Sequence, residues 1–226
     1  MSTRETAGTL RLPEREPPRR RADPFEGSNV DEETFLGVLD EVLEALNGAG
    51  VSYAAIGGLA SSILGRARWT HDVDVFLPDQ HEAERAMNAL AAAGFRTEKT
   101  DENWLYKGIK RGVLVDLIFK AKGDIYLDDE MLARSRVADF KGRAVRVIPP
   151  EDLIMIKAII HDEATPRHWY DALGVIATSE IDWEYLLRRS VRGPRRLLSL
   201  LVYAHTNDLI VPDRVIRHLF TTIYDA

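Results

Sequence analysis

The stretch IGGLASSILGRARWTHDVDVF, residues 56–76, carries a pair of glycines and two aspartates that share one short strand. Apolar residues lead into Gly57 and Gly58 as at the end of a strand, and a short helical run follows them. A second apolar strand then carries Asp72 and Asp74. Because side chains at positions i and i+2 project from the same face of a strand, we expect the two carboxylates on one surface.

This surface has the chemistry of a metal and phosphate site. Hard divalent cations such as Mg²⁺ prefer oxygen ligands, which paired carboxylates supply. Glycines beside the strand let the backbone approach a phosphate chain without a Cβ in the way. Each feature also has a plain alternative, since a lone Asp-x-Asp is often a solvated loop and a lone Gly-Gly a turn. The joint order of strand, glycines, helical spacer and aspartate-bearing strand favours a functional site.

The composition limits the kinds of protein to which this chain can belong. The chain has 226 residues with 45% hydrophobic content, which suits one large domain or two small ones with a real core. A net charge of −6 gives no global basic field, although a local patch could still bind nucleic acid. The absence of cysteine excludes disulfides and zinc–thiolate sites. No apolar run reaches the length of a membrane span and no hydrophobic signal core is present, so we expect a cytoplasmic protein.

The hydrophobic periodicity predicts an α+β protein in three parts. Residues 1–27 are rich in Pro, Arg and Glu and are predicted to be a disordered tail. Residues 28–149 combine strands and helices and are predicted to form an α/β domain. Residues 150–226 read as helix throughout and are predicted to form a helical lobe, with a cleft between the two parts.

The individual elements follow from the same periodicity and from turn residues. Helices are expected over residues 35–46, 59–64, 80–93, 151–161, 166–178, 182–190, 194–206 and 212–224. Strands are expected over residues 51–56, 73–77, 95–98, 104–109 and 113–119, with a hairpin of residues 137–140 and 144–148. Ser28 with Asp31 resembles a capping box before the first helix.

A third carboxylate, Asp116, lies inside the apolar strand VLVDLIF, residues 113–119. Burying its charge costs free energy unless something satisfies it. A cation shared with Asp72 and Asp74 would do so. Backbone amides or an arginine at the strand end would also do so, and the strand pattern alone leaves both open.

With these features the chain resembles the nucleotidyltransferase superfamily related to DNA polymerase β, which includes antibiotic adenylyltransferases and CCA-adding enzymes. The matching residues are the glycine pair and the three carboxylates. The resemblance implies that residues 28–149 form a short mixed β-sheet with helices packed on it. The resemblance implies that Asp72, Asp74 and Asp116 hold two Mg²⁺ ions, one activating the attacking hydroxyl and the other binding the triphosphate of an NTP. Gly57 and Gly58 would then lie against the nucleotide phosphates.

The predicted helical lobe carries a second resemblance. The segments EDLIMIKA (151–158) and RHWYDAL (167–173) are similar to the lysine-bearing helix and the Arg/Lys-Asp-x-Tyr-Asp helix of AbiEii/MenT-type nucleotidyltransferases, the toxins of certain toxin–antitoxin systems. By that resemblance Lys157 contacts nucleotide phosphates and Asp171 positions Lys157 or the base. His168 stands where the family often has aspartate.

The chemistry of the single residues leaves alternatives. Lys157 on a mostly apolar helix either snorkels to solvent or points into a cleft. Asp171 could instead pair with Arg167 one helical turn earlier. Arg66 and Arg68, in the loop before the aspartates, would either neutralise phosphate charge or lie solvated.

A basic cluster also stands out in this acidic chain. Its members lie within nine residues and are Arg188, Arg189, Arg192, Arg195 and Arg196. Such a cluster either receives an RNA backbone or consists of solvated arginines at two helix ends.

We therefore expect a Mg²⁺-dependent nucleotidyltransferase that moves NMP from an NTP to an acceptor. The favoured acceptor is tRNA or a protein in a toxin–antitoxin-like system, in which a cognate antitoxin would be a further partner. One alternative is an antibiotic-type adenylyltransferase that acts on a small molecule. Another is a degenerate module that binds nucleotide or a partner without catalysis, which the departure at His168 leaves open and the three carboxylates oppose.

Overall fold

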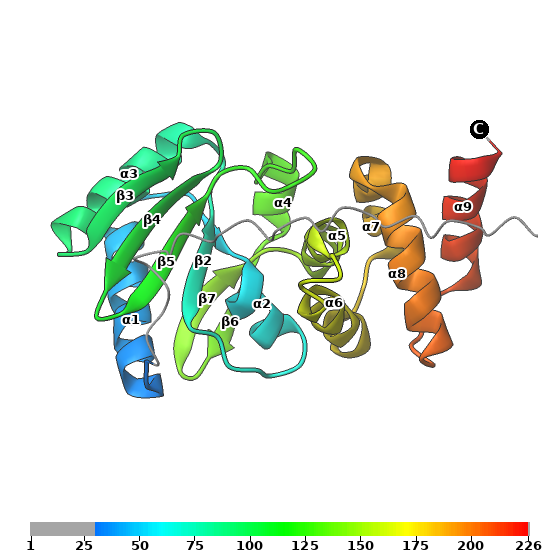
Figure 1. Cartoon of the computed structure of the whole chain (residues 1–226), viewed down its shortest axis with the longest axis horizontal. Helices are drawn as coiled ribbons and strands as arrows, with labels where there is room; N and C mark the ends of the chain where they lie inside the picture. Colours follow the sequence, from blue (N-terminus) through cyan, green and yellow to red (C-terminus); the bar gives the residue numbers. More distant parts are fainter. Residues whose placement is uncertain (1–29, 226) are drawn as a thin grey trace, which may run out of the picture.

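The computed structural model describes residues 30–225, which form a seven-stranded mixed sheet followed by a series of helices (Figure 1). The predicted α+β class with a helical C-terminal region is confirmed. The predictions of a tail over residues 1–27 and of a capping role for Ser28 lie outside the described residues. Asp31 caps the first helix, since its Oδ1 accepts a hydrogen bond of 2.8 Å from the amide of Thr34.

The helices are α1 (Glu32–Gly48), α2 (Gly57–Leu64), α3 (Gln80–Ala92), α4 (Asp129–Arg134), α5 (Pro150–Ile160), α6 (Arg167–Thr178), α7 (Trp183–Arg189), α8 (Pro194–Thr206) and α9 (Asp213–Tyr224), with a 3₁₀ turn η1 (Ser190–Arg192). The strands are β1 (Ala54–Ala55), β2 (Asp72–Phe76), β3 (Arg96–Asp101), β4 (Leu105–Lys110), β5 (Val113–Ile118), β6 (Arg136–Phe140) and β7 (Arg143–Val147). Their order in the sheet is β3-β4-β5-β2-β1-β7-β6.

The centre of the sheet sets the register of the candidate site. Strand β2 runs parallel to β5, and Asp74 on β2 stands opposite Asp116 on β5. Strand β4 runs antiparallel to β5 and places Lys107 opposite Asp116. Three charged residues therefore form one row across three neighbouring strands.

The two faces of this sheet differ in chemistry. Helices α1 and α3 cover one face, where Val73 and Val75 are buried between the charged positions of β2. A Cβ added to Gly108 of β4 would meet Leu90 of α3, so even-numbered positions of β4 point toward α3. Lys107, one residue away, points to the opposite face, because successive side chains of a strand alternate. The charged row thus faces away from α3.

Two elements differ from the sequence prediction. Strand β1 holds only two residues of the predicted 51–56, because the amide of Val51 bonds to the carbonyl of Leu46 and so closes the end of α1. Helix α4 was not predicted. It has six residues with one buried side chain, Met131, and so shows no helical repeat in the sequence.

The helices α5 to α9 extend from the sheet to the C-terminal end in Figure 1, with α9 outermost. Helix α5 begins at Pro150, the position of the predicted domain boundary. One cluster of buried side chains nevertheless runs through both parts, from Val30 to Leu219. The division into two domains therefore stays a prediction. No helix within residues 30–225 is long and apolar enough to cross a bilayer.

Candidate active site

The three predicted carboxylates line one cavity. Asp72, Asp74 and Asp116 are half-buried and border a space of about 440 Å³, which the glycine pair also lines. Asp72 and Asp74 share a strand face because they are two positions apart on β2. The parallel pairing of β2 and β5 brings Asp116 beside Asp74. Oδ1 of Asp116 lies 3.9 Å from the ammonium of Lys107.

The glycine pair begins helix α2 against the aspartates. Gly57 has a φ of +61°, and a Cβ there would lie 1.9 Å from Oδ2 of Asp74. A Cβ on Gly58 would lie 2.5 Å from the hydroxyl of Thr70. The amide of Gly58 donates a hydrogen bond of 3.0 Å to Oδ2 of Asp74. Only glycine therefore lets this backbone approach the carboxylates, and the helix N-terminus favours negative charge.

Burial penalises the ionised forms of Asp72 and Asp74. Burial raises the pKa of Asp74, and the amide of Gly58 and the charge of Lys157 only partly offset it. Burial also raises the pKa of Asp72, against the opposing charges of His71, Arg167 and Lys107. A cation bound to either carboxylate would favour its ionised form and reverse these shifts.

Lys157 enters the cavity from the helical side and is held there by Asp171. The ammonium of Lys157, only 3% exposed, donates a hydrogen bond of 2.8 Å to Oδ2 of Asp171. Arg68 donates to the same carboxylate through Nε at 2.7 Å and Nη2 at 2.9 Å. Two cations thus share one anion, which leaves a net positive charge of one beside Asp74. The alternative of a solvent-directed Lys157 is excluded.

The pKa values of Lys157, Asp171 and His168 are shifted by this arrangement. Burial lowers the pKa of Lys157, although the charges of Asp171 and Asp74 oppose the shift. Burial alone would raise the pKa of Asp171, but the bonds from Arg68 and Lys157 outweigh it and hold the pKa below its ordinary value. Burial, with the charges of Lys157 and Arg167, lowers the pKa of His168 to about 4, so this imidazole is neutral at pH 7.

Comparison with known proteins agrees with this geometry. The model of the family described as nucleotidyl transferase of unknown function, DUF2204, matches residues 36–189. The chain belongs to this family. Membership confirms the predicted nucleotidyltransferase superfamily, whereas the closer resemblance to AbiEii/MenT-type toxins stays a proposal. No curated protein matches the chain.

Solved structures of other nucleotidyltransferases share the fold. The antibiotic-resistance factor ANT(2'')-Ia is 18% identical with a TM-score of 0.51, over 78% of this chain and 94% of that chain. An antigenic nucleotidyltransferase-like protein from Paracoccidioides brasiliensis is 16% identical with a TM-score of 0.51, over 81% and 92% of the two chains. The toxin MenT4 from Mycobacterium tuberculosis H37Rv is 15% identical with a TM-score of 0.41, over 73% and 63%. Identities this low show the fold alone.

The donor set of this DUF2204 protein fits Mg²⁺ in kind. The anionic side chains that line the cavity are Asp72, Asp74 and Asp116, and carboxylate oxygens are the ligands that Mg²⁺ prefers. As they stand, no three His, Asp or Glu side chains within residues 30–225 converge on one point. Asp74 accepts the bond from the amide of Gly58 through Oδ2, one of its two oxygens.

Of the two arginines predicted to contact phosphate, Arg68 lines the cavity and Arg66 does not. Arg68 lines the cavity, but its guanidinium is engaged by Asp171. Arg66 is exposed, lies over the ring of Tyr170 at 5.2 Å and is not among the residues that line the cavity. The expectation that Arg66 faces the phosphates is therefore not supported by its position.

Other residues of the cavity were not singled out from the sequence. They are Trp69, Thr70, Trp104, Lys120 and Lys122, and Lys107 lies 3.9 Å from Asp116. Trp69 and Trp104 are 39% and 42% exposed, unusual for such large apolar rings. The interleaving of aromatic and basic residues along residues 104–122 was the signal that could have indicated this wall.

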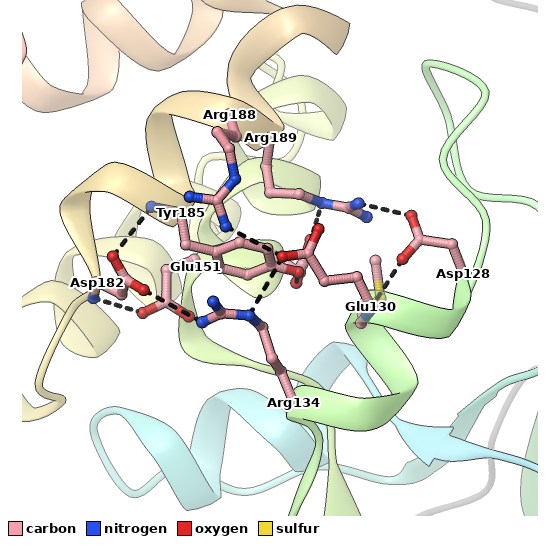
Figure 2. A network of polar contacts seen from close by, with 10 residues as sticks. Asp128, Glu130, Arg134, Glu151, Asp182, Tyr185, Arg188 and Arg189 are labelled. Atoms are coloured by element: carbon pink, nitrogen blue, oxygen red, sulfur yellow. Dashed lines mark hydrogen bonds and ion pairs between the residues drawn. The ribbon is translucent and has the colours of Figure 1, made fainter.

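The predicted basic cluster does not act as one free surface. Arg189 bonds to Asp152 on α5 at 2.6 Å and to Asp128 before α4 at 2.5 Å. Arg188 bonds to Glu130 at 3.0 Å. Figure 2 shows these arginines turned into a network that ties α7 to α4 and α5. None of the five arginines of the cluster is among the residues that line the cavity of the carboxylates.

Proposed function

We propose that this chain transfers a nucleoside monophosphate from an NTP to a hydroxyl group of an acceptor, with Mg²⁺. The observation that carries the proposal is the set of three carboxylates in register on β2 and β5, beside the glycine pair that begins α2. Family membership supports nucleotidyl transfer as the class of reaction.

In this proposal Asp72, Asp74 and Asp116 hold the metal. Bound Mg²⁺ would neutralise phosphate charge and increase the acidity of the attacking hydroxyl. The amides at the start of α2 would donate hydrogen bonds to phosphate oxygens, since Gly57 and Gly58 leave room for the phosphates. Lys157 and Arg68 would hold positive charge toward the triphosphate, while Asp171 fixes both in place.

In the proposed reaction one bond to phosphorus forms and one breaks. The acceptor hydroxyl gives up its proton to solvent, and its oxygen forms a bond to the α-phosphorus of the NTP. The bond from that phosphorus to the bridging oxygen of the β-phosphate breaks, and pyrophosphate leaves. Charge develops on the leaving pyrophosphate, and fixed cations in the cavity wall stabilise it.

The acceptor is proposed to be an anionic macromolecule, with tRNA favoured over a protein. Among residues 30–225, no acidic side chain other than the three proposed metal ligands lines the cavity. Lys120, Lys122 and Arg167 line it, together with Trp104. Basic side chains favour phosphates, and exposed aromatic rings favour stacked bases. A polycationic antibiotic finds no acidic wall here, so a small-molecule acceptor would have to be uncharged or anionic.

The experiment incubates the protein with each α-³²P-labelled NTP, Mg²⁺, total RNA and lysate protein. Label on RNA or protein in the wild type, absent with Asp74→Asn, supports transfer. Label that appears with neither acceptor, nor with a panel of small hydroxylated compounds, contradicts the proposal and leaves a non-catalytic module. Growth arrest on expression, relieved by Asp74→Asn, would support a toxin-like role.

A further inference from the structure

Lys107 has a place in this site that the family motifs do not mark. It lies on β4 opposite Asp116, which lies opposite Asp74, so the three residues form a row across β4, β5 and β2. Its ammonium is 3.9 Å from Oδ1 of Asp116. The side chains are 12% and 21% exposed, so water screens this contact only partly.

Beyond Asp116 the row continues to Asp74 on β2, and Asp72 lies two residues from Asp74 on the same strand face. The other buried cation of the site, Lys157, is bonded to Asp171 on the helical side. Lys107 is thus positioned to balance the carboxylates from the sheet side.

Other lysines near the sheet edge are committed elsewhere. Lys110, three positions further along β4, donates a hydrogen bond of 2.6 Å to the carbonyl of Ala93 and pairs with Glu41 on α1. Lys99 on β3 pairs with Glu84 at 2.6 Å. The contrast between Lys107 and Lys110 on one strand supplies a matched control.

We propose that Lys107 is the resident counter-ion of the carboxylate set: it holds Asp116 in place in the row across β4, β5 and β2 and lowers the affinity of the site for a divalent cation. This inference rests on the proposed function, since it presumes that the carboxylates bind metal. Lys107 is a positioning residue, because it acts through Asp116. Like charges repel more strongly where exposure is low, so removing the ammonium should tighten cation binding by about tenfold.

The test measures Mn²⁺ binding to the protein alone, by electron paramagnetic resonance of free Mn²⁺ at pH 8. The variants are Lys107→Met, Lys107→Arg, Lys110→Met and Asp74→Asn. We expect Lys107→Met to bind Mn²⁺ about tenfold more tightly, and Lys107→Arg and Lys110→Met to match the wild type. At saturating Mn²⁺ the kcat for transfer should fall in Lys107→Met and be retained in Lys107→Arg, because only the arginine keeps a charge that holds Asp116.

The outcomes separate this inference from the proposed function. Wild-type binding that Asp74→Asn abolishes, with unchanged or weaker binding in Lys107→Met, overturns the counter-ion role alone. Absence of any Mn²⁺ binding that depends on Asp74 overturns both the role and the metal assignment. If Lys107→Met does not fold, Lys107→Gln replaces it. If Lys107→Gln and Lys107→Arg then lose thermal stability to the same extent, and Mn²⁺ affinity to the same extent, Lys107 is purely structural and the counter-ion role is overturned.

Discussion

Asp171 of α6 accepts two hydrogen bonds from Arg68, at 2.7 and 2.9 Å, although the two residues are 103 positions apart in the sequence. Arg68 belongs to the loop that leads into the aspartate-bearing strand, and Asp171 to the helical part. The same carboxylate holds Lys157 at 2.8 Å. One buried anion therefore joins the two parts of the molecule and fixes both cations of the proposed phosphate site.

Asp171→Asn should destabilise the protein by about 3 kcal/mol, because it leaves two cations at a buried position without their anion. Unfolding in urea measures the change. The matched control is Asp40→Asn, which breaks the exposed two-bond pair of Asp40 with Arg143 on the surface. The control should cost a small fraction of that amount. Equal losses in the two variants would contradict the role of Asp171 as a buried anchor.

Lys157→Met should raise the KM for the NTP about tenfold, a loss of about 1.4 kcal/mol of binding. Its effect on the free energy of unfolding should be smaller than that of Asp171→Asn, because Arg68 still pairs with Asp171. Steady-state kinetics and urea unfolding separate the two effects. An unchanged KM together with a large loss of stability would show that Lys157 is structural.

Gly57→Ala should abolish transfer, because a Cβ at this position would lie 1.9 Å from Oδ2 of Asp74. The control is Gly142→Ala. Gly142 also has a positive φ, of +83°, but a Cβ there meets nothing within 4 Å. Backbone strain alone should cost Gly142→Ala about 1 kcal/mol and leave activity intact. Full activity in Gly57→Ala would argue against a close approach of α2 to the phosphates.

The sequence predicted the parts of the site that depend on local periodicity. Asp72 and Asp74 share a face because a strand repeats every two residues, and the apolar setting of Lys157 marked it as unusual. The roles of Lys107 and Trp104 could not be predicted, because they depend on how β4 pairs with β5. The partners of Arg68 and Arg189 lie on distant helices, so their charges read as solvated or phosphate-binding in the sequence alone. The six residues of α4 are too few to show a helical repeat.

The free energy of unfolding should depend on pH through Asp152. Burial raises the pKa of Asp152 to about 6, although Tyr185 and Arg189 bond to it and oppose the shift. The folded state then binds a proton more tightly than the unfolded chain. The stabilisation from this group is therefore full below about pH 4 and is lost as the pH rises to about 6.

Asp152→Asn removes this titration. The difference in the free energy of unfolding between wild type and variant should change between about pH 4 and 6, by on the order of 3 kcal/mol at most, and be constant above pH 7. Urea unfolding across this range measures it. A difference that does not vary with pH would contradict the raised pKa. Asp128→Asn, which removes the other carboxylate bonded to Arg189, should keep a slope of the same sign as the wild type.

The central claim, that Asp72, Asp74 and Asp116 form one catalytic set, is tested most directly by label transfer from α-³²P NTP with each carboxylate changed to asparagine in turn. The account predicts that every variant unfolds at a temperature close to that of the wild type and that each loses transfer by at least about a hundredfold. Normal transfer in any one folded variant would contradict the set.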